Sequence, residues 1–343
     1  MNDQTTAWVA WGLIGAAALP NHNFELGPNI RIELATPDRL HQLLREEPVA
    51  SHPNIPWPEY FSTLPARLIV RSSWVIWLRA TATNADEAWD LITNDQLPIV
   101  VAALSVFGTP LPRIELLRIG REDSKGVIHE PRTKWIGGTF GGFATRHLSQ
   151  EEVPVLTAIH SAANRFATSP SRHFYEALCQ RDQSDHSSRN LGNTILSYFL
   201  VIEEIAQNAV LRKQIDELKK PGNETDDEEK TKLTEILNEL RRSLKDDTEA
   251  ATHIRSIEKA LNDTKRLRRQ YLNQKIEDAG THLGIEQSTI TDSLEIARIR
   301  NSSLGHPGHV PSEVLLEFVE TAEHCSTAFL SAFIRWSMES RLD

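Results

Sequence analysis

Cysteine and methionine are scarce in this chain. Only two of its 343 residues are Cys (Cys179 and Cys325), and only two are Met. Two cysteines are too few for the disulfide framework that stabilises small secreted domains, and they fit a reducing compartment. Hydrophobic residues make up 40% of the chain, which excludes a wholly disordered or collagen-like protein and is enough to form a sizeable core.

The chain also lacks an excess of positive charge and a long hydrophobic run. It has 37 Lys and Arg against 47 Asp and Glu, a formal net charge of −10. This balance excludes a uniformly basic nucleic-acid-binding surface, although not a local basic groove. The apolar run Trp8–Leu19 has only 12 residues, too few to span a bilayer, and no positively charged segment precedes it. We therefore expect a soluble, cytoplasmic protein with no membrane partner.

Common motifs for phosphate, nucleotide and metal binding are missing. The chain has no Walker A loop, CxxC, HExxH or GxSxG pattern, and the stretch Gly137–Gly142 lacks the Lys followed by Ser or Thr that holds phosphate and Mg²⁺. His306 and His309 are three residues apart, but no Cys or carboxylate accompanies them as a further ligand. The glycine-rich stretch is therefore interpreted as a loop between strands, and neither a metal nor another cofactor is predicted.

The residues that are present are unevenly distributed. Seven of the eight Trp precede residue 136, and 14 of the 17 Pro precede residue 171. Residues 211–300 instead contain 18 Lys and Arg and 19 Asp and Glu. Because the two parts differ so much, we predict an α+β protein with two domains. The first, over 1–168, is a mixed α/β domain that senses a signal or positions a substrate, and the second, over 169–343, is all-helical.

The first domain is predicted to combine strands with helices. Asn29–Leu34 alternates apolar and polar residues with the period of a half-buried strand. Asn84 is a candidate N-cap for a helix that ends near Ile92, with Glu87 placed as in a capping box. The other elements predicted before residue 166 are strands at 7–13, 68–82 and 114–119 and helices at 97–107 and 151–165.

The second domain is predicted to be a helical bundle with a charged insertion. Arg189–Arg212 and Ser312–Met338 carry long apolar faces. Leu and Ile recur at helical spacing among dense charges over about 213–285, which predicts an inserted helical hairpin. The hairpin contains the densest positive cluster of the chain, namely Lys265, Arg266, Arg268 and Arg269. These residues either contact RNA phosphates or form a solvated face of the hairpin.

One group of residues, Arg300, Asn301 and His306, suggests a specific chemistry. A His can exchange a proton with the attacking 2′-hydroxyl or the leaving oxygen of RNA, because its pKa lies near 6.5. An Arg can donate hydrogen bonds to the phosphate as its charge grows in the transition state. Asn301 can hold the Arg or the phosphate by hydrogen bonds. Together they form a candidate ribonuclease site that needs no metal.

Spacing alone does not identify this site. Three Arg–His pairs have four to six intervening residues, and about three are expected by chance from 26 Arg and 13 His. Arg45–His52 crosses an acidic, proline-containing loop, and Arg181–His186 lies in a polar linker. Arg300–His306 instead lies between two amphipathic helices of the predicted bundle. Its context, rather than its spacing, favours it.

The stretch IARIRNSSLGHPG resembles the Arg-Asn…His-Gly signature of HEPN domains, which are small helical bundles. The segment NTILSYFLVIEEIAQ is similar to the long early helix of the Apea-like branch of that family, with Glu203 and Glu204 at the acidic position. The resemblance covers roughly 170–212 and 286–340. This chain departs from commoner members in Pro307, which follows the His, and in its Ser-Ser-Leu-Gly spacer.

The resemblance implies a metal-independent endoribonuclease that leaves 2′,3′-cyclic phosphate and 5′-hydroxyl ends. It implies Arg300 and His306 as catalytic residues and a homodimer with two Arg/His pairs in one cleft. Glu203 and Glu204 can orient Arg300 through a buried salt bridge, but only one of them can share the buried face, and the alternative is that at least one faces solvent. Such domains serve in phage defence or as toxins and often act on tRNA. His309 is a supporting candidate for RNA contact. The predicted partners are therefore RNA, a second copy of the chain and a regulatory protein.

An alternative assigns no catalysis to the helical half. In that case the domain is an inactive HEPN scaffold for dimerisation or binding, and the first domain senses a ligand or partner. The acidic net charge and Pro307 favour this alternative. The early Trp residues either stack on bases or pack in the core. The long apolar faces at 189–212 and 312–338 separately suggest a dimer, because one small bundle has limited surface to cover them.

Overall fold

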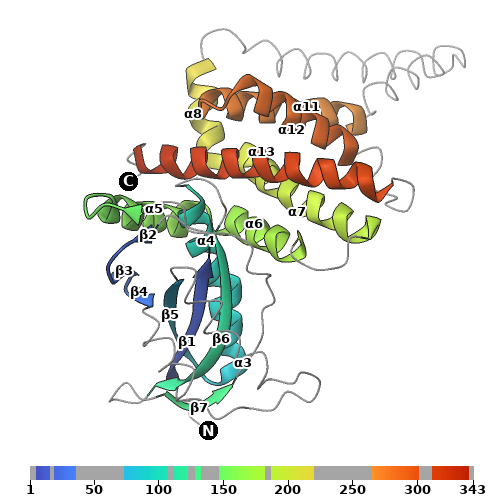
Figure 1. Cartoon of the computed structure of the whole chain (residues 1–343). Coiled ribbons are helices and arrows are strands. Elements are labelled where there is room, and N and C mark those ends of the chain that lie inside the picture. The colour runs from blue at the N-terminus through green and yellow to red at the C-terminus, as the bar shows by residue number, and fades with distance from the viewer. Residues whose placement is uncertain are drawn as a thin grey trace, which may run out of the picture.

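The computed structural model shows an α+β fold, with an antiparallel sheet in the first part of the chain and helices from residue 152 onward (Figure 1). The two parts lie against each other, with the sheet on one side and the helical layer on the other. The structure describes residues 5–15, 19–35, 73–106, 112–122, 128–132, 147–181, 187–219, 264–300 and 311–339.

The main sheet has six strands in the order β3-β4-β5-β1-β6-β7, and each neighbouring pair is antiparallel. The strands are β1 (Thr6–Gly15), β3 (Phe24–Gly27), β4 (Ile30–Ala35), β5 (Ser73–Ala82), β6 (Arg113–Glu122) and β7 (Ile128–Arg132). Two short strands, β2 (Leu19–Pro20) and β8 (His147–Leu148), form a separate parallel pair. The strands predicted at 7–13, 29–34 and 114–119 are confirmed. The one predicted at 68–82 is confirmed from residue 73, because 68–72 lie outside the described residues.

Tryptophan residues of the first half of the chain belong mainly to the core. Trp8, Trp11, Trp74 and Trp89 are each less than 7% exposed. The indole Nε1 of Trp8 donates to Ala82 O at 3.3 Å, and that of Trp74 donates to Pro20 O at 3.1 Å. A buried indole N–H needs such a partner. Packing in the core, rather than base stacking, is therefore confirmed for these four, whereas Trp57 and Trp135 lie outside the described residues.

Between β5 and β6 the chain forms one continuous helical segment. It comprises α3 (Ala85–Leu91), a π-helical turn η1 (Ile92–Gln96) and α4 (Leu97–Ser105). Asn84 caps the segment as predicted, because its Oδ1 accepts hydrogen bonds from the backbone N–H groups of Asp86 and Glu87 at 3.0 and 2.9 Å. All nine residues of α4 are buried. This helix lies between the sheet and the helical layer, where it contacts β6 and three helices of that layer.

Pro98 explains the π-helical turn. An α-helix would require the N–H of residue 98 to donate to the carbonyl of Asn94, but proline has no N–H and its ring clashes with that carbonyl. The chain therefore widens over Ile92–Gln96, and the Leu97 N–H donates five residues back to Ile92 O. The sequence analysis predicted two separate helices here, one that ends near Ile92 and one over 97–107, whereas the structure joins them through this turn.

The helical layer is built around α7 (Ser188–Gln207), which contacts α6, α8, α11, α12 and α13. The other described helices of the layer are α5 (Glu152–Phe166), α6 (Thr168–Arg181), α8 (Ala209–Lys219), α11 (Thr264–His282), α12 (Gln287–Ile299) and α13 (Ser312–Glu339). The helix predicted over 189–212 is broken at Asn208, whose Oδ1 accepts from the N–H groups of Val210 and Leu211, each at 3.1 Å. Asparagine is a favoured N-cap, so it starts α8 in a new direction.

The range predicted for a projecting hairpin, about 213–285, was too wide. Ile215 on α8 and Ile276 and Ala279 on α11 are buried in the bundle. Arg212 joins the two helices, because its Nη2 donates to Lys275 O at 2.7 Å and its Nη1 lies 3.5 Å from Asp278 Oδ2. Both ends of the range are therefore bundle helices. The residues between them, 220–263, lie outside the described part of the chain.

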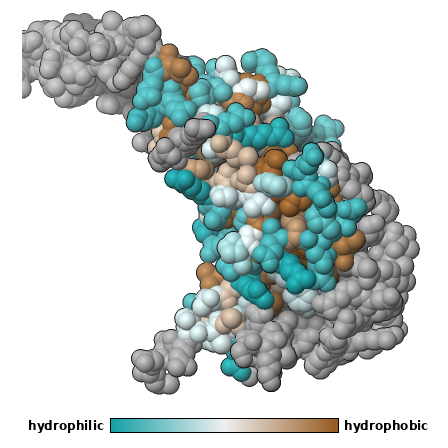
Figure 2. All heavy atoms as spheres, turned by 90° about the vertical axis from the view of Figure 1, so that its left-hand side faces the viewer, coloured by the Kyte–Doolittle hydropathy of each residue, from teal (hydrophilic) through white to brown (hydrophobic). Residues whose placement is uncertain are grey.

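The two halves share a core. One cluster of buried hydrophobic residues extends from Trp8 and Trp74 in the sheet to Phe329 and Phe333 in α13. The break predicted near 168 is a single residue, Ala167, between α5 and α6. On the face drawn in Figure 2, hydrophobic patches are separated by hydrophilic residues. Among the described helices, no single one is long and apolar enough to cross a membrane, although α7 and α8 together, bent by 49°, meet that test by length and composition.

Where α5 meets the sheet, His160 packs against Gly27 of β3. A Cβ atom at Gly27 would lie only 3.3 Å from His160 Cε1, so glycine allows the imidazole to approach the strand. Burial lowers the pKa of His160 to about 4, because a protonated ring would lose its hydration there. The native state therefore keeps His160 neutral at pH values where the unfolded chain protonates it.

We predict that this histidine makes the fold sensitive to acid. Between pH 6.5 and 4, His160 is protonated in the unfolded chain but neutral in the folded one. The free energy of unfolding therefore keeps its full value above pH 6.5 and falls as the pH decreases from 6.5 to 4. The full loss is roughly 3 kcal/mol. His160→Gln removes this loss, so urea unfolding at pH 7 and 4.5 should show a smaller decrease for this variant. The control His324→Gln, at an exposed position of α13, should follow the wild type. Equal decreases in all three proteins would contradict the prediction.

Candidate functional site

Arg300 lies at the C-terminal end of α12. Its backbone is helical, and its N–H donates to the carbonyls of Ile296 and Ala297. The helix is fixed in the bundle because Thr289, Ser293 and Ile296 are buried on one face. A cationic side chain at this position also complements the partial negative charge of a helix C-terminus. The side chain of Arg300 is 30% exposed, so it is held by the fold but still reaches solvent.

Two side chains of α7 hold the guanidinium of Arg300. The Arg300 Nη1 atom lies 2.8 Å from Glu203 Oε2, and its Cζ atom lies 4.9 Å from the centroid of the Phe199 ring. Glu203 Oε2 is buried and lacks an aligned hydrogen bond, so the contact with Arg300 is one of charge. The other oxygen of Glu203, Oε1, accepts from Gln207 Nε2 at 3.1 Å. Phe199, Glu203 and Gln207 are four residues apart and therefore share one face of α7.

This arrangement holds the guanidinium of Arg300 in place and leaves some of its N–H groups able to bond a ligand. An arginine carries five N–H donors in a planar fork. The guanidinium carbon lies over the Phe199 ring, and Glu203 approaches a single nitrogen. A fixed, partly exposed fork of this kind is suited to the oxygens of a phosphate. The nearby carboxylate lowers the net positive charge of the site.

The remaining predicted catalytic residues cannot be placed next to Arg300. Asn301, His306 and His309 all lie in 301–310, outside the described residues. The competing pair Arg45–His52 and residue His186 lie outside them as well. Arg181 of the second competing pair is described and has a structural role. It pairs with Glu323 of α13, whose Oε2 also accepts from the Tyr198 hydroxyl at 2.8 Å.

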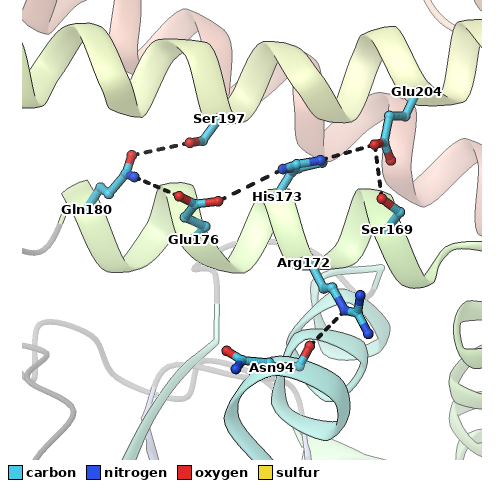
Figure 3. Close-up of polar contacts among 8 residues, drawn as sticks. All are labelled: Asn94, Ser169, Arg172, His173, Glu176, Gln180, Ser197 and Glu204. Atoms are coloured by element: carbon cyan, nitrogen blue, oxygen red, sulfur yellow. Dashed lines mark hydrogen bonds and ion pairs between the residues drawn. The ribbon is translucent and has the colours of Figure 1, made fainter. Parts of the chain in front are cut away.

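Glu204, the second acidic candidate, faces α6 instead of Arg300. Its Oε1 accepts from Ser169 Oγ at 2.9 Å and lies 3.1 Å from His173 Nε2 (Figure 3). Adjacent residues of a helix point about 100° apart, so Glu203 and Glu204 contact different helices. The expectation that only one of them meets Arg300 agrees with this geometry, and the one in contact is Glu203.

Sequence reasoning missed the row of polar side chains between α6 and α7 that Figure 3 shows. On α6 the row continues from His173 to Glu176, with 3.9 Å between Nδ1 and Oε2, and then to Gln180, whose Nε2 donates to Glu176 Oε1 at 3.1 Å. Ser197 of α7 completes it by donating to Gln180 Oε1 at 3.3 Å. Successive spacings of four, three and four residues along α6 from Ser169 were an available signal for one polar face.

The predicted RNA-binding residues Lys265, Arg266, Arg268 and Arg269 lie in the first turns of α11, and only their backbone is described. The next turn carries a feature that sequence reasoning missed. Tyr271 is 63% exposed, and Lys275 Nζ lies 4.1 Å from the centroid of its ring. An exposed aromatic ring beside a cation is suited to stacking on a base.

Cys325 is not a reactive thiol, and no metal cluster occurs among the described residues. Cys325 is buried on α13, and burial raises its pKa to about 11, so it stays protonated and inert at neutral pH. Within the described part of the chain, no group of three or more His, Cys, Asp and Glu is placed to hold a metal ion.

Comparison of the chain with protein-family models, with curated proteins and with solved structures found no match.

We predict that Glu203 contributes more to stability than a surface carboxylate does. Glu203→Gln leaves Arg300 on Phe199 without a counter-charge, which should cost about 1–2 kcal/mol in the free energy of unfolding. The control Glu295→Gln removes an exposed partner of Arg298 at 3.8 Å on the same helix and should cost less than about 0.5 kcal/mol. Urea unfolding measures both values. Equal effects would show that the Glu203–Arg300 contact is an ordinary surface pair.

Proposed function

We propose that the helical half is a metal-independent endoribonuclease of the HEPN type, with Arg300 and His306 as its catalytic residues. The observation that carries this proposal is the fixed position of Arg300 between Phe199 and Glu203, at the helix end that leads directly to His306. The acidic residue in contact with Arg300 belongs to the helix that resembles the HEPN helix. This contact supports the expectation that one of the two acidic residues of that helix is the partner of Arg300.

In the proposed reaction, His306 accepts the proton of a 2′-hydroxyl and the 2′-oxygen attacks the adjacent phosphorus. The bond to the 5′-oxygen breaks, and this oxygen takes a proton from the second histidine of a dimer or from water. The products are a 2′,3′-cyclic phosphate and a 5′-hydroxyl. Arg300 donates hydrogen bonds to the non-bridging oxygens as negative charge develops on them. Asn301 adds a hydrogen bond, and Glu203 keeps the guanidinium in place.

The substrate of this proposal is RNA, with tRNA as one candidate class. Tyr271 and Lys275 offer a stacking surface on α11 that follows the basic residues 265–269 in sequence. Binding through such residues is salt-dependent, because it releases counterions from the phosphates. We place the activity in phage defence or a toxin system of the cytoplasm. There the sheet-containing half senses a signal or positions RNA, and a regulatory protein restrains cleavage.

A second candidate function is a non-catalytic HEPN module for dimerisation or ligand sensing. The shared core of the two halves favours it, because a binding event in the first half is then transmitted to the second. The ion pair with Glu203 also suits an arginine that only joins α12 to α7. The two functions differ in one respect that can be measured, which is RNA cleavage dependent on Arg300 and His306.

We predict cleavage of total RNA by the purified protein in the presence of EDTA, with 5′-hydroxyl and 2′,3′-cyclic phosphate ends. Arg300→Ala and His306→Ala should each lower the rate by about 100-fold or more. Arg298→Ala is a matched control, because it removes an exposed arginine from the same turn of α12, and it should retain activity. Equal rates for all four proteins, or no cleavage by the wild type, would favour the binding module.

We predict a dimer in solution as part of the same proposal. The structure weakens one sequence argument for it, because the apolar faces of α7 and α13 are mostly buried within a single chain, although Val314 and Leu316 of α13 are exposed. The dimer now rests on the need for two Arg/His pairs in one cleft. Light scattering at micromolar concentration should give about 77 kDa, which is twice the chain mass of 38.7 kDa. A species of 38.7 kDa alone would contradict a stable two-copy cleft.

A further inference from the structure

Arg172 joins the helical layer to the sheet-containing half at a defined point. Its Nε donates to the backbone carbonyl of Asn94 at 2.9 Å (Figure 3), and its Nη2 pairs with the carboxylate of Asp95. Both partners belong to the π-helical turn η1. The side chains of Arg172 and Asp95 are 50% and 43% exposed, so solutes and partner proteins can reach this contact.

The acceptor for Arg172 is a consequence of the backbone. Asn94 O is the carbonyl that Pro98 cannot pair in an α-helix, because Pro98 has no N–H. A carbonyl at such an interruption is readily bonded by a side chain from a neighbouring helix. The Arg172 contact is therefore directed at a specific backbone atom and is more than an exposed ion pair. It ties α6 to the turn between α3 and α4.

His173, the residue that follows Arg172 in α6, contacts Glu204 of α7. His173 lies 3.1 Å from Glu204 Oε1 of α7, and Ser169, one turn earlier, donates to the same oxygen at 2.9 Å. Arg172 and His173 are adjacent, so a displacement of this turn of α6 changes both contacts together. The same turn of α6 is thus bonded to η1 on one side and to α7 on the other (Figure 3).

The last contact leads to Arg300. Glu204 is adjacent to Glu203, which lies 2.8 Å from Arg300 Nη1. Two pairs of adjacent residues, Arg172–His173 and Glu203–Glu204, therefore connect η1 with Arg300 through α6 and α7. Helices transmit such displacements because they are stiff and close-packed.

We propose that this series of contacts is a regulatory connection, through which the sheet-containing half controls how firmly Arg300 is held. Release of Arg172 from η1 loosens the contact between His173 and Glu204, and with it the hold of Glu203 on Arg300. A cationic group that binds Asp95 competes with Arg172 and is therefore the chemical class of effector that fits. The purpose of this control rests on the proposed ribonuclease function, but the connection itself can be measured without RNA.

Hydrogen exchange followed by mass spectrometry tests the connection in the full chain. Arg172→Gln should raise the exchange rate of peptides that cover the last turn of α12 by about threefold or more. Asp95→Asn should act in the same direction. The control Arg165→Gln changes an exposed arginine of α5 that stacks on Phe166 and should leave the exchange of α12 unchanged. Unchanged α12 exchange in Arg172→Gln, or an equal rise in every peptide of the protein, would overturn the proposal.

A variant that combines Glu203→Gln with Arg172→Gln tests whether the two substitutions act on α12 through the same contacts or independently. Glu203→Gln alone should raise α12 exchange, and adding Arg172→Gln should raise it little further, because both changes act through Glu203. Multiplied rate increases in the double variant would overturn the proposal.

The exchange result and the cleavage result are independent of each other. Faster α12 exchange in Arg172→Gln, without RNA cleavage by the wild type, supports the connection and rejects the ribonuclease. Cleavage that depends on Arg300 and His306, with α12 exchange unaffected by Arg172→Gln, supports the ribonuclease and rejects the connection.

Discussion

Burial of α7 is the constraint on which the helical half depends. Eleven of its residues are buried. Its apolar face is covered by α6, α11, α12 and α13, and two acidic residues at the edges of that face point into seams between helices. Glu203 and Glu204 occupy two of these seams. The position of Arg300 is therefore a result of how the core is packed as well as of one ion pair.

Local sequence patterns predicted which helices and strands form better than they predicted where those elements begin and end. The alternation at Ile30 and Ile32 identified β4, and Asn84 identified the start of α3, because each signal lies within a few residues of the element it defines. The limits of the charged insertion were wrong for the opposite reason. In α11, Ile276 and Ala279 are buried, but charged neighbours dominate the sequence there. Which face of such a helix is covered depends on distant segments, here α7, α8 and α12, and a local pattern does not contain that information.

The same distinction applies to the candidate site. Arg300 and an acidic partner on α7 could be proposed from the sequence, because the resemblance links two distant segments. Phe199, Gln207 and Tyr271 were not proposed, although each is placed by helical spacing from a residue that was. Arg172 could not have been found at all, since its acceptor is a backbone carbonyl 78 residues away. A contact to a backbone carbonyl does not depend on the side chain of the residue that provides it, so the sequence contains no pattern that predicts it.

Because Pro98 has no backbone N–H, a carbonyl of the preceding helical turn is left to bond another part of the protein. In most helices every internal carbonyl is consumed by the helix itself, so a helix presents only side chains to its surroundings. Here the interruption turns a main-chain oxygen outward as a docking point for Arg172. Because that oxygen is part of the backbone, substitution of Asn94 leaves it in place, whereas replacing Pro98 by a residue with an N–H would restore a regular helix and withdraw it. The contact between Arg172 and η1 thus depends on Pro98, although Pro98 itself donates no hydrogen bond to α6 or to the candidate site.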